Sequence, residues 1–261
     1  PYSALVFGTS RLTSAINDAD PDFWKKYAIA SELTVGIIGT DAGKEFQTYI
    51  HRNHWLGSTR PIPLGWKTQI SNGGEPTLMY KVKYMKPLYE AHWKKVPTNN
   101  MIQVIGSAEG SAGYYTNAAI GLNIRAGYFK TAYWHDSPDF GSSANQVAVE
   151  PKWFRDQCEG YFFASGRIRA VGYNALLQGQ FKQSAHTFAP SQINNFIYEF
   201  ETGFSVKLGG VTFIYEFIAG RTAEFNTDLS RTHIWGAASL SYQRPEKPKS
   251  IPPAANDIIP E

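Results

Sequence analysis

Hydrophobic and polar residues alternate almost without interruption over residues 196–208. Phe196, Tyr198 and Phe200 share one parity, whereas Glu199 and Glu201 share the other. Because successive side chains of a strand point to opposite faces, the segment is predicted to be a strand with one aromatic and one polar face. Such a strand, with its hydrophobic face outside and its polar face inside, is typical of a β-barrel in lipid.

The same period-2 pattern predicts nine strands in all. They are expected near residues 2–10, 27–38, 77–89, 101–114, 118–128, 160–172, 195–208, 210–220 and 232–243. Arg, Lys and Glu recur on the face opposite the hydrophobic one, as Arg167 and Arg169 do around Ile168. In a soluble sandwich these charges would face water, and the hydrophobic faces would pair. In a barrel they line the lumen, whereas a charge on the lipid face costs roughly 2–4 kcal/mol at the bilayer midplane.

Composition supports an all-β, antiparallel, transmembrane outer-membrane barrel. Aromatic residues make up 15% of the chain and charged residues only 18%, as expected for a barrel with aromatic girdles. No apolar run reaches the roughly 20 residues of a membrane-spanning helix. The single cysteine, Cys158, excludes an internal disulfide. No run of Lys and Arg indicates a nucleic-acid partner, and no phosphate-binding loop or zinc spacing is present.

The chain is divided into a barrel over residues 1–243 and a Pro-rich tail over residues 244–261, which is expected in the periplasm. Counting strands back from the tail places residues 39–76, 173–194 and 221–231 outside the cell. The same count implies an odd number of strands before Pro1, and three would complete a twelve-stranded barrel, since single-chain bacterial barrels have even strand numbers. Residues 129–159 either hide two short strands or fold inward or onto the periplasmic rim.

Residues 40–54 are the segment most suited to chemistry. Thr40 or Asp41 can cap a short helix in this extracellular connection, with Glu45 in its early part. Gln47 and His51 are then four residues apart and share one face. A histidine beside a hydrogen-bonding amide can act as a general base, although two solvated helix residues would show the same spacing.

Other polar and aromatic residues have structural interpretations. His54 and His186 are expected to be loop residues, and Asp136 and Asp139 flank a turn at Pro138. Six tryptophans are predicted to be anchors at the membrane interface: Trp24, Trp66, Trp93, Trp134, Trp153 and Trp235.

Two sequence blocks surround the candidate pair. The first runs from Val35-Gly-Ile-Ile-Gly-Thr-Asp-Ala-Gly-Lys-Glu-Phe-Gln47 to His51, and the second is Pro63-Leu-Gly-Trp-Lys-Thr-Gln-Ile-Ser-Asn72. Both resemble the outer-membrane lipid A 3'-O-deacylase family, and the second is similar to that family's Gly-Trp-x-x-Gln-x-x-Asn-Glu segment. Pro1-Tyr-Ser-Ala-Leu5 resembles the family's Pro-Tyr-Ala-Gly-Trp strand, from which Ser3 and Leu5 depart. Gly73 and Gly74 move Glu75 two places away from the family's Asn-Glu pair.

The resemblance implies a twelve-stranded barrel that hydrolyses the 3'-linked acyl ester of lipid A with Ca²⁺. It matches His51 to the family's catalytic histidine, which deprotonates water, and Gln47 to the nearby glutamine. The family's calcium ligands and catalytic lysine cannot be placed on this chain. An alternative is therefore a catalytically inactive barrel that serves as an accessory subunit, with a protein partner bound through residues 244–261. A passive porin fits less well, because inward charges of both signs would fill a narrow lumen.

Overall fold

The computed structural model describes residues 2–52, 61, 64–135, 158–228 and 230–242. Predictions about the tail at 244–261, His54, Trp153, Asp136 and Asp139 fall outside these residues. Among the described residues, no helix is both long and apolar enough to cross a bilayer.

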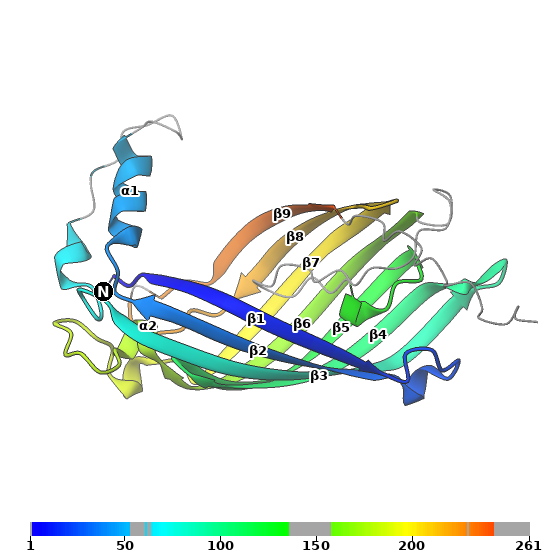
Figure 1. Cartoon of the computed structure of the whole chain (residues 1–261), viewed down its shortest axis with the longest axis horizontal. Helices are drawn as coiled ribbons and strands as arrows, with labels where there is room; N and C mark the ends of the chain where they lie inside the picture. The colour runs from blue at the N-terminus through cyan, green and yellow to red at the C-terminus, as the bar shows by residue number, and fades with distance from the viewer. Residues whose placement is uncertain (1, 53–60, 62–63, 136–157, 229, 243–261) are drawn as a thin grey trace, which may run out of the picture.

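In the described part of the chain, nine strands form one curled antiparallel sheet in which every strand pairs with its neighbour in the sequence (Figure 1). All nine predicted strands are present, and the largest shift is in β1, which lies further along the chain than predicted. The strands are β1 (Leu5–Ile16), β2 (Tyr27–Ile38), β3 (Glu75–Trp93), β4 (Val96–Gly113), β5 (Tyr115–Phe129), β6 (Cys158–Asn174), β7 (Phe196–Leu208), β8 (Val211–Arg221) and β9 (His233–Tyr242). The all-β antiparallel class is confirmed, whereas twelve strands remain a prediction.

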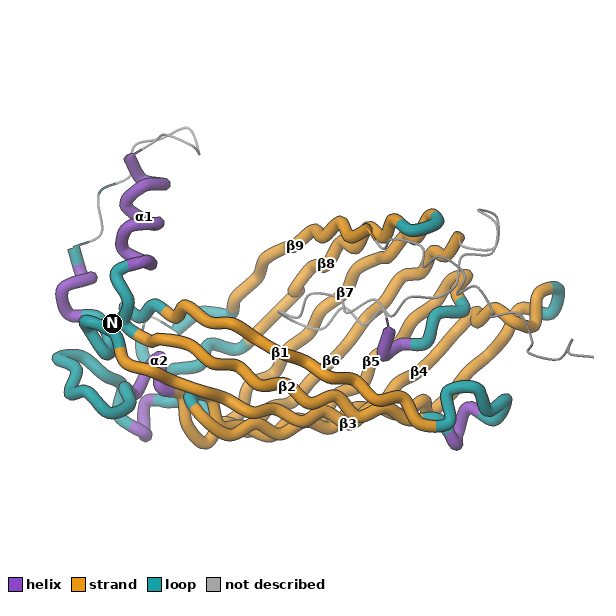
Figure 2. The backbone as a smooth tube through the Cα atoms, in the orientation of Figure 1, coloured by secondary structure: helices purple, strands orange, loops and turns teal. Residues whose placement is uncertain are grey.

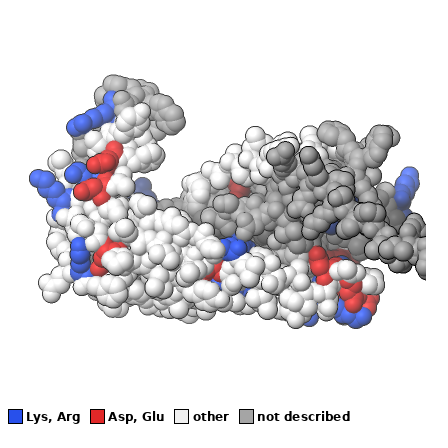
Figure 3. All heavy atoms as spheres, viewed as in Figure 1, with Lys and Arg blue, Asp and Glu red and all other residues white. Residues whose placement is uncertain are grey.

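The two faces of the sheet differ as the alternation predicts. On β7, Phe196 and Phe200 are 60% and 51% exposed on the outer face, whereas Ile197 and Glu201 are 0% and 5% exposed on the inner face. Uncharged residues dominate the visible outer surface, and charged residues gather mainly at its two ends (Figure 3). Apolar side chains exposed to the outside and polar side chains buried inside fit a sheet that faces lipid.

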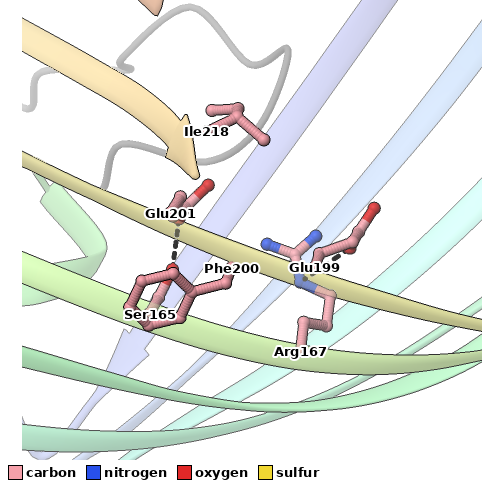
Figure 4. A pocket seen from close by; sticks show the side chains of 6 residues that line it. All are labelled: Ser165, Arg167, Glu199, Phe200, Glu201 and Ile218. Atoms are coloured by element: carbon pink, nitrogen blue, oxygen red, sulfur yellow. Dashed lines mark hydrogen bonds and ion pairs between the residues drawn. The ribbon is translucent and has the colours of Figure 1, made fainter. Parts of the chain in front are cut away.

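Charges of both signs pair across the inner face, as predicted. Arg169 Nη1 on β6 lies 2.8 Å from Glu109 Oε1 on β4, and Arg221 Nε on β8 lies 2.9 Å from Glu199 Oε1 on β7. Figure 4 shows Arg167 directed toward Glu199. These pairs link β4 to β6, β6 to β7 and β7 to β8, and removing one partner of such a buried pair would leave an uncompensated charge.

The segment after β5 folds inward against the sheet. Tyr133 and Trp134, in a short 3₁₀ turn (Tyr133–His135), are each 4% exposed and pack with Ala28, Met85 and Ile105 of the inner face. Of the alternatives for residues 129–159, inward folding therefore holds for the described part. The prediction of an interfacial position is wrong for Trp134, which is buried in this cluster.

Arg125 on β5 organises this inward turn. Its side chain is fully buried, and its guanidinium lies 4.4 Å from the ring centroid of Phe129 and 5.0 Å from that of Tyr161. It donates hydrogen bonds to Gln103 Oε1 and to Thr131 O, at 3.2 and 3.1 Å. Aromatic faces and neutral oxygens therefore surround the Arg125 guanidinium, whose Nη1 is buried without a hydrogen-bond partner among the described residues.

The connections divide between the two ends of the sheet. One end carries α1 (Ala42–Arg52), a 3₁₀ turn (Gly65–Thr68), α2 (Ala175–Gln178) and a second 3₁₀ turn (Pro190–Gln192) (Figures 1 and 2). The other end carries the 3₁₀ turn Phe23–Lys25 and the connections between β3 and β4 and between β7 and β8. The predicted helix is thus present as α1, projecting beyond the strand ends in Figure 1, and its extracellular position stays a prediction.

Candidate functional site

Helix α1 positions the two residues singled out by the sequence. The helix begins where Glu45 N donates to Asp41 O at 2.9 Å, and it continues to Arg52. Gln47 and His51 are both partly exposed and lie one turn apart on one face. The structure therefore brings both predicted site residues to the same end of the sheet.

His51 makes one hydrogen bond that determines which ring nitrogen carries its proton. Its Nδ1 lies 2.9 Å from the carbonyl oxygen of Pro61. A carbonyl oxygen can only accept, so Nδ1 must carry the hydrogen in the neutral ring. The second nitrogen, Nε2, is then the unprotonated one and can accept a proton. This is the arrangement that a histidine general base requires.

Gln47 is oriented by Trp66, which lies in the 3₁₀ turn Gly65–Thr68. Trp66 Nε1 donates to Gln47 Oε1 at 2.9 Å, and the Trp66 side chain is 8% exposed. Because the amide oxygen receives this bond, the amide nitrogen of Gln47 is the group left to act as a donor. The prediction that Trp66 is an interfacial anchor is therefore wrong.

Trp66 is itself closely packed by neighbouring residues. Its ring lies 4.9 Å from the ring of Tyr2, centroid to centroid. A Cβ on Gly43 would come within 2.8 Å of Trp66, and one on Gly65 within 2.1 Å of Tyr2. Glycine at these two positions allows α1, the 3₁₀ turn and the chain before β1 to approach one another closely.

Hydrogen bonds join the chain that enters α1 to residues 69–74. Gln69, which is 1% exposed, donates through Nε2 to Thr40 O at 3.4 Å and to Asn72 Oδ1 at 3.2 Å. Gly74 N donates to Gly39 O at 3.1 Å. These bonds connect the start of α1 to the segment that leads into β3.

Sequence reasoning missed Trp66 and Tyr2 as parts of this site. The signal for Trp66 was its place in the Gly-Trp-x-x-Gln segment of the resemblance, although the residue was interpreted as an anchor. The spacing of residues in that segment carried no information about which side chain Trp66 contacts. His186, which was predicted to be a loop residue, is exposed in the connection between α2 and β7.

Within the described residues, no group of three or more His, Cys, Asp or Glu side chains is arranged to hold a metal ion.

A curled antiparallel sheet with an apolar exterior and a charge-paired interior has the architecture of an integral outer-membrane protein. The comparisons agree, since the family model described as outer membrane protein LpxR matches residues 1–244. The chain belongs to this family, and its predicted outer-membrane location is confirmed.

Among solved structures, LpxR from Salmonella typhimurium has a similar fold, with a TM-score of 0.70 and 18% sequence identity. The match covers 92% of this chain and 73% of that chain. At this identity the likeness concerns the fold. A comparison with curated protein sequences finds no match.

Proposed function

We propose that the protein is an esterase that removes the 3'-linked acyl chains of lipid A in the outer membrane. The observation that carries the proposal is the hydrogen bond between His51 Nδ1 and Pro61 O, which leaves Nε2 as the base. The family membership and the resemblance around residues 35–72 supply the substrate class.

In this proposal His51 Nε2 removes a proton from water, and the resulting hydroxide adds to the ester carbonyl carbon. The bond from that carbon to the 3' oxygen then breaks, and the proton on His51 passes to the departing sugar oxygen. The products are a free fatty acid and a 3'-hydroxyl group. The amide nitrogen of Gln47 is directed to donate a hydrogen bond to the water or to the carbonyl oxygen, since Trp66 occupies the amide oxygen.

Calcium enters the proposal through the family resemblance alone. It would supply positive charge to the developing oxyanion, and among the described residues no group of three His, Cys, Asp or Glu side chains is arranged to hold it. No step above is therefore assigned to the ion. Deacylation measured in a chelator and again after Ca²⁺ is added tests the requirement.

The proposed setting is the outer leaflet, with α1 outside the cell. The apolar outer face places the sheet in lipid, and α1 lies at one end of the strands, where lipid headgroups would be in reach (Figure 2). We further propose that the barrel closes with twelve strands, since within the described residues β1 and β9 each pair with a single neighbour.

The test is mass spectrometry of lipid A from cells that express the full-length protein or a variant. Wild-type protein should reduce the mass of lipid A by the 3'-linked acyl chains, and His51→Ala should abolish this change. His186→Ala is the matched control, because His186 is an exposed loop histidine at the same end of the sheet. An undiminished His51→Ala variant removes His51 from its role, and unchanged lipid A with wild-type protein in Ca²⁺ refutes the esterase.

A second variant separates orientation from chemistry at Gln47. Trp66→Phe keeps an aromatic ring against Tyr2 but loses the donor to Gln47 Oε1. A neutral hydrogen bond contributes about 0.5–1.5 kcal/mol, so the rate should fall roughly two- to tenfold. A rate equal to that of the wild-type protein would show that Gln47 needs no such orientation.

A further inference from the structure

A buried carboxylate joins two connections that are far apart in the sequence. Glu75, the first residue of β3, is 3% exposed. Its Oε2 accepts hydrogen bonds from Phe181 N at 3.1 Å and from Lys182 N at 2.9 Å. Its Oε1 accepts a hydrogen bond from Ser71 Oγ. Both oxygens of Glu75 are therefore engaged, one by each connection.

Flanking bonds reinforce the junction between residues 71–77 and 180–184. Ser71 N donates to Ser184 Oγ at 2.9 Å, and Lys182 Nζ donates to Gly74 O at 2.7 Å. Thr77 Oγ1 donates to Gln180 Oε1 at 2.7 Å. Glu75 is the one charged acceptor among these contacts, and hydrogen bonds to an ionised acceptor are roughly twice as strong as neutral ones.

The two glycines before Glu75 allow its carboxylate to reach this position. Gly73 and Gly74 have φ values of 82° and 81°, in the left-handed region that glycine adopts without strain, and Ser71 has a φ of 56° in the same region. The resulting turn takes up the extra residues between Asn72 and Glu75. Glu75 is the first residue after this turn and begins β3.

Contacts lead from the junction to the chain that enters helix α1 and to Gln47. A Cβ on Gly39 would lie 1.9 Å from Ser71 O, so the segment bearing Ser71 packs directly against the chain that enters α1. Gln69 contacts Thr40 in the same region. The turn that contains Trp66 precedes Gln69 and holds Gln47.

We propose that Glu75 is a positioning residue for the site on α1. It ties residues 69–74 to the connection at 180–184, and residues 69–74 in turn hold the start of α1 and the turn that orients Gln47. The part of this inference that concerns catalysis rests on the proposed function. The part that concerns the placement of α1 does not.

Hydrogen–deuterium exchange of the folded full-length protein tests the placement. In Glu75→Ala, loss of the hydrogen bonds to a charged acceptor should speed exchange in residues 39–52 and 66–74 by about ten- to a hundredfold. Glu75→Gln should have a smaller effect, because its amide oxygen can still accept from Phe181 N and Lys182 N. Unchanged exchange in residues 39–52 while residues 180–184 exchange faster would overturn the proposal.

Glu159→Gln is the matched control. Glu159 is 5% exposed, and it accepts hydrogen bonds from the backbone and side chain of Thr131 at the opposite end of the sheet. This variant should speed exchange around Thr131 and leave residues 39–52 as in the wild-type protein. If Glu75→Gln and Glu159→Gln speed exchange in α1 equally, the cause is general loosening of the protein, and a specific role for Glu75 is refuted.

Kinetics separate failure of the positioning role from failure of the proposed function. Glu75→Ala should lower kcat with little change in KM, and Glu75→Gln should recover part of the loss. His51→Ala should lose activity while exchange in residues 66–74 stays as in the wild-type protein. If the wild-type protein has no esterase activity, the exchange measurement still decides the placement. If Glu75→Ala fails to fold, Ser184→Ala is the substitute variant, because it removes the hydrogen bond from Ser71 N to Ser184 Oγ. It should speed exchange in residues 39–52 and 66–74, and unchanged exchange there would overturn the proposal.

Discussion

Replacing Arg125 with lysine should destabilise the barrel although the positive charge is kept. The guanidinium of Arg125 lies on the rings of Phe129 and Tyr161 and donates hydrogen bonds to Gln103 and Thr131. An ammonium group cannot spread across two rings and two acceptors in this way, because it lacks the planar fork of the guanidinium.

The expected magnitude follows from these contacts. Loss of one hydrogen bond from a charged donor removes about 1.5–3 kcal/mol, and the weaker contact with the aromatic rings removes about 0.5–1 kcal/mol more. The free energy of unfolding should therefore fall by about 2–4 kcal/mol. The segment that includes Tyr133 and Trp134 should loosen at the same time, since Arg125 holds Thr131.

The assay is urea-induced unfolding of the protein in phospholipid vesicles, followed by tryptophan fluorescence. Arg231→Lys is the control, because Arg231 is exposed in the connection before β9. Its effect should stay within about 0.5 kcal/mol. A change of the same small size in Arg125→Lys would refute the reasoning that the planar guanidinium holds this end of the sheet.

Two further predictions concern the faces of the sheet. A Cβ on Gly203 would lie 2.1 Å from Tyr215 O, so Gly203→Ala should reduce the yield of folded barrel on heat-modifiability gels. Gly160→Ala is the control and should fold normally, because a Cβ on Gly160 would have no neighbour within 4 Å. Equal yields of the two variants would contradict the close packing at Gly203. Phe162 is 72% exposed on the outer face, so Phe162→Lys should destabilise the folded protein in vesicles by roughly 2–4 kcal/mol while Phe162→Leu should not. Tolerance of the lysine would argue that this face does not contact lipid.

Much of the sheet could be predicted from the sequence because strand patterning is local. Phe196 and Ile197 differ in exposure as their parity requires, since adjacent side chains of a strand always point to opposite faces. Helix α1 was predicted from the same kind of short-range evidence, a cap and a spacing of four residues. The ends of β1 were less well placed, because its pattern continues into small polar residues that alternate weakly.

The candidate site was only partly predictable. The spacing of Gln47 and His51, together with the resemblance, identified the two residues. Neither could identify Pro61 O as the group that determines the proton position on His51, because that contact depends on how the chain returns from α1. Trp66 was assigned to the membrane interface because tryptophans of a barrel are common there, whereas packing against Tyr2 and Gly43 buries it.

The sequence by itself determined strands with one hydrophobic and one polar or charged face, and a helix that carries Gln47 and His51. These properties depend on residues one to four positions apart, whose relative directions follow from backbone geometry. Only the tertiary structure decided that Glu75 accepts hydrogen bonds from residues 181 and 182, and that Arg125 lies among aromatic rings. Such contacts join segments that are distant in the sequence, and they arise where the folded chain brings those segments together.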